Sequence, residues 1–144
     1  KARAVAEQTG EWSVADDSGL MATALGGAPG VRSARVAADD PARIAWLLAQ
    51  MEALPEEQRA AEFVCALALA EGSGKVLGRW EGCVRGRILR EPRGHHGFGY
   101  DPVFLHEPSG KTFAEMTREE KSAVSHRGQA LRQLRDWLAG QLAS

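Results

Sequence analysis

The sequence predicts a single α/β domain over residues 1–144, and three patterns support this prediction. Residues 41–51 and residues 126–142 each repeat apolar side chains at helical spacing. Between them, AEFVCALALA at residues 61–70 is almost continuously apolar, as expected for a strand covered on both faces. No repeat, low-complexity tract or linker interrupts the sequence, so we expect one domain with one core.

The first expected elements are a helix, a short strand and a loop. KARAVAEQT at residues 1–9 favours a helix with Gly10 as its C-cap. Residues 12–15 form an extended run that we expect to end at the polar segment DDSG, residues 16–19. The glycine- and proline-rich segment GGAPGVRSAR, residues 26–35, indicates an ordered loop.

A helix and two paired strands are expected next. The helix begins with Asp40 as N-cap and Pro41 at the first helical position, and it ends before Pro55. The turn GSG then joins two extended runs, residues 61–70 and 75–89, which we expect to be antiparallel neighbours.

The C-terminal third predicts a strand and two helical segments. Residues 98–105 form a strand candidate that is followed by the turn HEPSGK. Thr117 and Glu120 have the spacing of a capping box, which starts a helix. The last helix carries one apolar stripe that we expect to face the core, made of Leu131, Leu134, Trp137, Leu138 and Leu142.

Composition limits the classes of partner. The formal charge of −1 gives no electrostatic reason to expect nucleic acid. The longest apolar run, residues 63–70, is far shorter than the ~20 residues that cross a bilayer, so no membrane partner is expected. Cys65 and Cys83 form no CxxC pair and are expected to be reduced core thiols. With no signal-peptide pattern, the expected location is cytoplasmic.

Four polar clusters are candidates for chemistry, and the first is ADDSGL at residues 15–20. A carboxylate there can hold Mg²⁺ and accept a proton from water. Alternatively, Asp16 and Asp17 cap a turn. Adjacent side chains on extended backbone point to opposite sides, so we expect only one of the two acids to face a given pocket.

The loop at residues 26–35 and the segment HHGFGYDPVF at residues 95–104 are the next two candidates. The loop could cradle a phosphate through backbone N–H groups, or it is a structural turn with solvated arginines. Glycine beside aromatic rings lets a flat ligand approach and stack, but a bulged strand with two core rings explains the same residues. His95 and His96 are interpreted as the turn that leads in.

The fourth candidate is EKSAVSHRGQA, residues 120–130, where Lys121, Ser125, His126 and Arg127 gather at a helix start. Basic groups there favour an anion or an acceptor oxygen, although a polar helix cap is the alternative. A zinc site is not expected, because HExxH is absent and adjacent histidines on a strand face opposite ways.

Together, in order, five motifs resemble the inosine/xanthosine triphosphate pyrophosphatase family: ADDSGL, GAPGVRSAR, GFGYDPVF, TFAEM with Lys121, and SHRGQAL. The resemblance extends from about residue 1 to the end of the chain. It implies an elongated α/β fold in which helices flank a mixed central sheet and two lobes enclose a nucleotide cleft, usually in a homodimer. It also implies hydrolysis of the non-standard purine nucleotides ITP, dITP and XTP to the monophosphate and pyrophosphate with Mg²⁺, which cleanses the nucleotide pool.

The resemblance assigns roles by position. Asp17 matches the family's metal-linked proton acceptor, and Ser18 matches a substrate contact. The base-binding segment of the family is matched by Phe98, Gly99, Tyr100 and Asp101. Further nucleotide contacts are matched by the basic residues Lys121, His126 and Arg127. Family members begin with a strand, a T/S-x-N-x-x-K loop and a metal-binding Glu, which this sequence lacks because it starts at Lys1. An alternative is therefore an N-terminally truncated, weakly active or inactive purine-nucleotide-binding module.

Base selection is expected at the purine 6-position. Hypoxanthine and xanthine present an acceptor oxygen there, whereas adenine presents a donor amino group, and Arg127 carries only donors. A polar site of this kind can reject the wrong group by about 10⁴–10⁵. Guanine shares the 6-oxygen, so its rejection must involve the 2-position. A general Mg²⁺ phosphohydrolase is a third hypothesis, but it leaves the aromatic segment unexplained.

Overall fold

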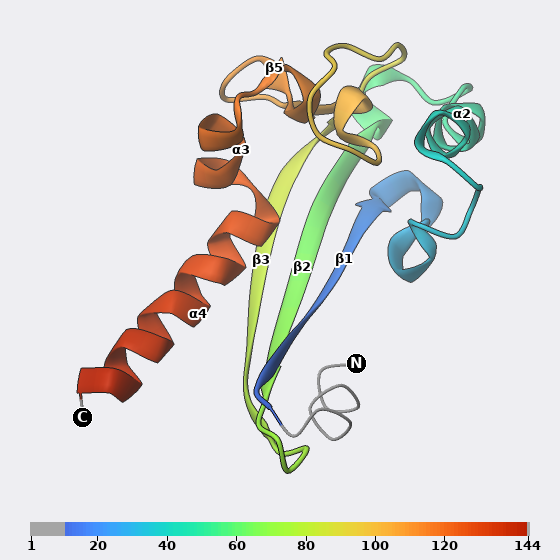
Figure 1. Cartoon of the computed structure of the whole chain (residues 1–144). Helices are drawn as coiled ribbons and strands as arrows, with labels where there is room; N and C mark the ends of the chain where they lie inside the picture. The colour runs from blue at the N-terminus through green and yellow to red at the C-terminus, as the bar shows by residue number, and fades with distance from the viewer. Residues whose placement is uncertain (1–10, 144) are drawn as a thin grey trace.

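Three long strands and two short ones form the sheet of this chain, whose computed structural model describes residues 11–143. The strands are β1 (Ser13–Ala22), β2 (Ala60–Ala70), β3 (Val76–Ile88), β4 (Phe104–His106) and β5 (Lys111–Thr112). They lie in the order β1-β2-β3-β4-β5, and each neighbouring pair is antiparallel (Figure 1). The helix expected over residues 1–9 lies outside the described residues.

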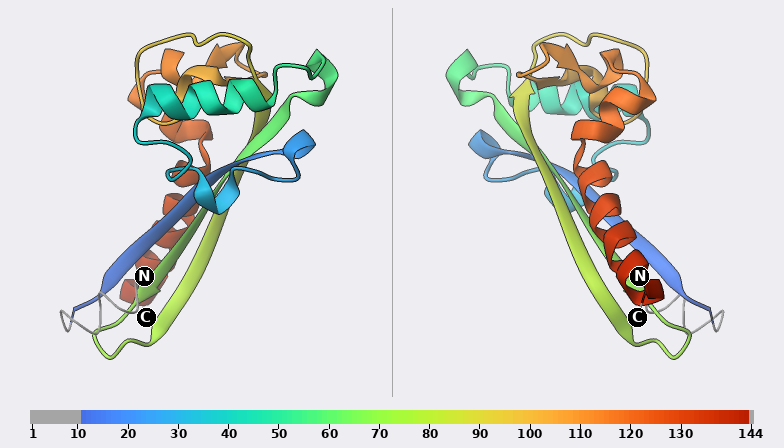
Figure 2. Two further views of the ribbon diagram at one scale, coloured as in Figure 1. Left: turned by 90° about the vertical axis from the view of Figure 1, so that its right-hand side faces the viewer. Right: turned by 90° about the vertical axis from the view of Figure 1, so that its left-hand side faces the viewer.

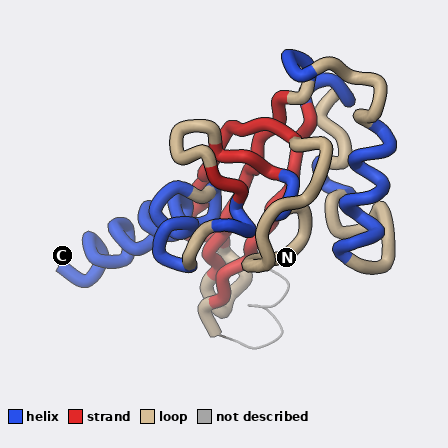
Figure 3. The backbone as a smooth tube through the Cα atoms, turned by 90° about the horizontal axis from the view of Figure 1, so that it is seen from above, coloured by secondary structure: helices blue, strands red, loops and turns tan. Residues whose placement is uncertain are grey.

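Helices lie at one end of the sheet and along one face of its long strands. Helix α2 (Asp40–Gln50) and helix α3 (Arg118–Val124) lie near β4 and β5 at one end, and α4 (His126–Ala143) runs along the long strands (Figure 2). Seen from above, α2 and α4 lie on opposite sides of the strands (Figure 3). The elongated α/β fold is confirmed. The parallel pairing that a mixed sheet requires is not among the pairs formed by the described strands.

Strand β1 corrects the expectation that the first extended run ends at residues 16–19. The strand continues through both aspartates to Ala22, and its register against β2 runs unbroken from Ser13↔Ala70 to Ala22↔Ala61. Backbone pairing with β2 along the whole of β1 therefore outweighs the turn preference of DDSG. As a result, the acidic residues lie within a strand and alternate between its faces.

Strand β2 is fully covered on one face only. Alternate residues, including Cys65 and Leu67, are buried, whereas the intervening ones are half-buried. The covered face packs against α4 through Ala130 and Leu134. The expected antiparallel pairing of β2 with β3 is confirmed.

The helix starts follow local capping chemistry. The N-cap of α2 is Asp39, one residue before the expected Asp40, and its Oδ1 accepts from Ala42 N at 2.9 Å. The capping box of α3 is confirmed, because Glu120 N donates to Thr117 Oγ1 at 3.1 Å and the reciprocal bond is also 3.1 Å.

The strand expected over residues 98–105 is mostly a turn. A single 3₁₀ turn spans Asp101–Val103, and β4 begins only at Phe104. Gly97 and Gly99 have φ of 74° and 61°, which are left-handed conformations and not extended ones.

The stripe of α4 faces the core only in part. Leu134 is buried, and Trp137 packs on Trp80 with ring centroids 5.5 Å apart. Leu131 is 46% exposed, which contradicts its placement in the core, and the side chain of Leu142 lies outside the described residues. Of the two free cysteines, Cys65 is buried as expected but Cys83 is exposed.

The main core lies where the sheet meets α2 and the 3₁₀ turns. Phe63 of β2 contacts Phe104 and Phe113, with ring centroids 4.6 and 5.6 Å away. Among the described residues, none of the helices is long and apolar enough to span a membrane. The packing of these buried rings fixes the backbone that carries the polar clusters of the sequence.

Candidate functional site

Two adjoining cavities lie where the polar clusters meet. The first, which we call the β1 cavity, has a volume of about 470 Å³. Its lining includes all nine residues to which the family resemblance assigns a role: Asp17, Ser18, Phe98, Gly99, Tyr100, Asp101, Lys121, His126 and Arg127. The second, the α3 cavity, has about 490 Å³ and is lined largely by α3 and the start of α4. The two cavities share Phe98, Lys121, His126 and Arg127.

Asp16 and Asp17 both line the β1 cavity, contrary to the expectation that only one acid faces a given pocket. The two side chains alternate across β1, but the lining includes Leu20 from one face of the strand and Gly19 from the other. Because β1 is the edge strand of the described sheet, the cavity reaches both of its faces.

Asp16 is fully engaged by its neighbours. Its carboxylate accepts from Ser18 Oγ and from Arg127 Nε, each at 2.6 Å, and from Cys65 Sγ at 3.6 Å. Burial acts to raise the pKa of Asp16, but the hydrogen bonds from Ser18 and Arg127 outweigh it and lower that pKa. The family resemblance gives Asp16 no role, although its parity with Ser18 and Leu20 places it on the face that α4 covers.

Asp17 is exposed, and no other described side chain forms an ion pair or hydrogen bond with its carboxylate. Asp17 thus presents a free anion to the cavity, one position along the strand from an anion that is already neutralised. This contrast separates the two aspartates chemically: Asp16 supports Arg127, and Asp17 is available to a ligand.

Two members of the expected base-binding segment have internal partners. Tyr100 is buried, and its hydroxyl donates to Ser33 O at 2.6 Å; burial raises the pKa of Tyr100 to about 12. Gly99 N donates to Asp40 Oδ2 at 2.8 Å, which ties the segment to the start of α2. These two contacts fix the backbone of the segment against two other walls of the cavity.

Asp101 is 3% exposed and forms the base of this turn. Its Oδ2 accepts from Lys121 Nζ at 2.5 Å and from Phe98 N at 3.1 Å. Burial raises the pKa of Asp101, even though the ammonium of Lys121 acts in the opposite direction. Asp101 therefore positions both Lys121 and Phe98.

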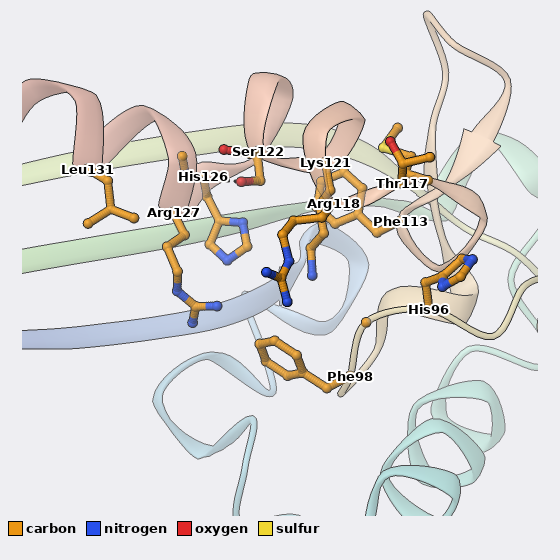
Figure 4. A pocket seen from close by; sticks show the side chains of 14 residues that line it. His96, Phe98, Phe113, Thr117, Arg118, Lys121, Ser122, His126, Arg127 and Leu131 are labelled. Carbon is orange, nitrogen blue, oxygen red and sulfur yellow. Dashed lines mark hydrogen bonds between the residues drawn. The ribbon is translucent and has the colours of Figure 1, made fainter.

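Phe98 is the exposed ring of the site, with 58% of the residue accessible. Lys121 Nζ lies 4.7 Å from its ring centroid and Arg127 Cζ lies 5.4 Å away. Figure 4 shows the ring across the α3 cavity from these two cations and from His126. An exposed ring beside two cations can stack with a flat ligand that carries acceptor oxygens.

His126 is a neutral group in this wall. It is 5% exposed and stacks on Phe63 with centroids 4.7 Å apart. Burial, together with the charges of Arg127 and Lys121, lowers the pKa of His126 to about 4. Its Nδ1 is buried and has no hydrogen-bond partner among the described residues.

Metal ligation by protein groups alone has little support. Over residues 11–143, no group of three or more His, Cys, Asp or Glu side chains is arranged to hold a metal ion. Mg²⁺, however, is commonly held by one or two carboxylates together with waters and substrate phosphates. The free carboxylate of Asp17 fits such a shared site.

The fold and this site define a class of α/β proteins in which acidic, aromatic and basic side chains line adjoining cavities beside the sheet. The model of the Ham1 family matches residues 1–137, and the chain belongs to that family. The resemblance that the five motifs suggested is thereby confirmed.

Relatives at about half identity carry a common name. A dITP/XTP pyrophosphatase from Gloeobacter violaceus is 56% identical over 134 residues, which cover 93% of this chain and 67% of the relative. Another from Thermosynechococcus vestitus is 52% identical over 137 residues, covering 95% of this chain and 70% of the relative.

Solved structures of the family are also similar. A HAM1 protein from Coxiella burnetii has a TM-score of 0.89 and 46% identity, over 96% of this chain and 73% of that one. A nucleoside-triphosphatase/dITP/XTP pyrophosphatase from Mycobacterium abscessus has a TM-score of 0.76 and 49% identity, over 92% and 71% of the two chains.

Proposed function

We propose that this chain hydrolyses ITP, dITP and XTP to the nucleoside monophosphate and pyrophosphate. The observation that carries the proposal is the β1 cavity, which joins the free carboxylate of Asp17 to the wall formed by Phe98, Lys121 and Arg127. The names of the relatives support the same reaction. They favour it over a binding module without chemistry.

The purine would stack on Phe98. Lys121 and Arg127, both close to that ring, carry only hydrogen-bond donors and favour the 6-oxygen of hypoxanthine or xanthine. An adenine amino group would set donor against donor, so the remaining N–H groups of these cations would face no acceptor. Neutral His126 lines the same wall, but only its Nε2 can face a ligand because its Nδ1 is buried.

Asp17 would act at the phosphate end. Its carboxylate and the substrate phosphates would hold Mg²⁺, which when bound neutralises phosphate charge. Asp17 orients a water molecule and accepts its proton while the water oxygen forms a bond to the α-phosphorus. The bond from that phosphorus to the bridging oxygen breaks, and pyrophosphate leaves. Asp16 keeps Arg127 in place and takes no proton, because Arg127 and Ser18 already occupy its oxygens.

Pyrophosphate release from dITP, XTP, dATP and dGTP, measured side by side with Mg²⁺ on the 144-residue chain, tests the proposal. Asp17→Asn should lower the turnover of dITP by at least about 100-fold, because the variant cannot accept the proton. Asp39→Asn is the matched control, since Asp39 caps α2 outside both cavities and Asn caps equally well. Equal rates on the four nucleotides, or near-normal turnover by Asp17→Asn, would contradict the assignment.

The location and assembly of the chain belong to the same proposal. We expect a cytoplasmic homodimer that binds neither nucleic acid nor membrane; the family resemblance supports the dimer, and the formal charge of −1 supports the lack of nucleic acid. Light scattering during size exclusion should give twice the chain mass of 15.5 kDa, and a mass of one chain would contradict the dimer.

A further inference from the structure

The charged side chains of the β1 cavity are largely paired with one another. Three ion pairs line it: Arg43 with Asp40 at 2.6 Å, Lys121 with Asp101 at 2.5 Å, and Arg127 with Asp16 at 2.6 Å. Each pair places a carboxylate against a cation that would otherwise attract an anionic ligand. These three cations therefore have little charge left for phosphates.

Two charged residues of the lining remain. Within residues 11–143, neither Asp17 nor Arg35 has an ion-pair partner, and Arg35 is exposed. Asp17 is placed at the metal and the water by the proposed function. Among the described residues, Arg35 is thus the unpaired cation of this cavity, and it has no role in the proposed mechanism.

The loop that carries Arg35 is held firmly beside the cavity. Ser33 Oγ donates to Gly30 O at 2.6 Å and accepts from Leu20 N at 2.9 Å, which fastens the loop to β1. Tyr100 fixes the backbone carbonyl of Ser33, and Arg43 donates to Ala34 O at 2.9 Å. The two residues that precede Arg35 are therefore anchored, so its side chain extends from a fixed backbone.

The loop has few backbone amides left for a phosphate. Ser33 N donates to Gly30 O at 3.1 Å and Arg35 N donates to Arg32 O at 2.7 Å. Arg32 N is occupied by Pro29 O at 2.9 Å. Most of the backbone N–H groups in the cradle that the glycine-rich sequence suggested are therefore committed to internal turns, so the Arg35 side chain is the stronger candidate for binding an anion.

We propose that Arg35 binds the β- and γ-phosphates of the substrate and, after cleavage, the pyrophosphate product. The inference rests on the proposed function and adds a residue to it. A planar guanidinium with several donors matches phosphate oxygens in a bidentate manner. Because Asp17 and Arg35 line the same cavity, the α-phosphorus lies near the carboxylate while the leaving group is held by the cation.

Calorimetric titration of the 144-residue chain with inorganic pyrophosphate and, separately, with dIMP tests the inference without relying on turnover. Arg35→Gln should weaken pyrophosphate binding by about tenfold or more and leave dIMP affinity within about twofold. Arg35→Lys should retain part of the affinity, because it keeps the charge but not the fork. Arg32→Gln is the matched control, since Arg32 is exposed on the same loop but lines neither cavity.

Several results would overturn the inference. They are a wild-type chain that binds no pyrophosphate, an Arg35→Gln variant that binds it normally, and an equal loss in Arg32→Gln, which would indicate a general charge effect. If Arg35→Gln loses pyrophosphate selectively but the wild-type chain hydrolyses no dITP, the anion site stands and the proposed function fails. If the wild-type chain hydrolyses dITP but Arg35→Gln binds pyrophosphate normally, the proposed function stands and the anion site at Arg35 fails.

Discussion

At the scale of single residues, the site combines cations that are committed to carboxylates with one histidine that carries no charge. Lys121 and Arg127 gain fixed positions from Asp101 and Asp16, at the cost of part of their attraction for anions. His126 is buried against Phe63 beside both cations and has no carboxylate partner of its own in the described chain. Burial and the two neighbouring cations disfavour a third positive charge there, which makes His126 sensitive to acid.

Acidification should therefore destabilise the fold through His126. Its pKa is about 4 in the folded chain against an ordinary 6.5, so between these values the unfolded chain binds a proton that the folded chain does not. Stability from this group is complete above pH 6.5 and falls as the pH drops toward 4, by about 3 kcal/mol at most. Urea unfolding at pH 7 and pH 4.5 measures the loss, and His126→Phe, which keeps the ring on Phe63, should show less of it.

The control for this effect is His95→Phe, in the exposed turn before Phe98. It should lose as much stability on acidification as the wild-type chain. An unchanged pH dependence in His126→Phe would mean that other groups account for the acid sensitivity.

At the scale of elements, the position of α4 depends on a close approach to β3. A Cβ at Gly82 would lie 2.0 Å from His126 O and 2.9 Å from Gln129 Cβ, so only glycine fits under the first turn of the helix. Gln129 then fastens the same turn, because its amide accepts from Cys83 N at 3.2 Å and donates to Cys83 O at 2.8 Å. These contacts place His126 and Arg127 relative to the sheet.

Gly82→Ala should consequently push the start of α4 away from β3. We expect a loss of about 1–3 kcal/mol in the free energy of unfolding, together with weaker dIMP binding, because Arg127 moves relative to β1. Gly140→Ala is the matched control, because Gly140 lies near the end of α4 and a Cβ there meets none of the described residues within 4 Å. Helix propensity predicts a gain of up to about 1 kcal/mol. Chemical denaturation gives both values, and equal stabilities of the two variants would contradict the packing assigned to Gly82.

The elements also show what local sequence can predict. The β2–β3 hairpin and the capping box of α3 were predictable, since hydrophobic pattern and cap chemistry act over a few residues. The extension of β1 through DDSG was not, because pairing with β2, about 48 residues away in sequence, decides it. The turn at Phe98 was missed for a different reason: an aromatic, apolar segment favours a strand, and only the positive φ of Gly97 and Gly99 excludes it.

At the scale of the whole molecule, the site exists only where distant segments meet. Motif resemblance identified which residues would gather, and the β1 cavity contains all of them. It did not predict their internal pairing: Arg127 and Asp16, which are 111 residues apart, form an ion pair that no local pattern indicates. Arg35 was likewise considered only as a solvated residue or part of a backbone cradle, because its lack of a partner is a property of the assembled cavity.

The proposed function gives the cavity a base end and a phosphate end, which should be separable by mutation. Bound dIMP would stabilise the folded chain by about 2.7 kcal/mol at a concentration of 100 times its dissociation constant. Phe98→Ala removes the stacking ring, so we expect dIMP to bind roughly tenfold more weakly and to raise the melting temperature less. Because Phe98 is 58% exposed, the melting temperature of the ligand-free variant should remain close to that of the wild-type chain.

Asp17→Asn is the complementary variant. We expect its turnover to be lost and its stabilisation by dIMP to be retained, because the proposal puts Asp17 at the phosphate end and its carboxylate forms no hydrogen bond or ion pair with the described side chains of the base wall. Thermal shift with and without dIMP, read beside pyrophosphate release, compares the two variants directly. A chain that only bound purine nucleotides would respond to Phe98→Ala alone and would have no turnover for Asp17→Asn to remove. If instead Asp17→Asn abolished dIMP stabilisation, the division of the cavity into two ends would be wrong, and Asp17 would have to be placed at the base.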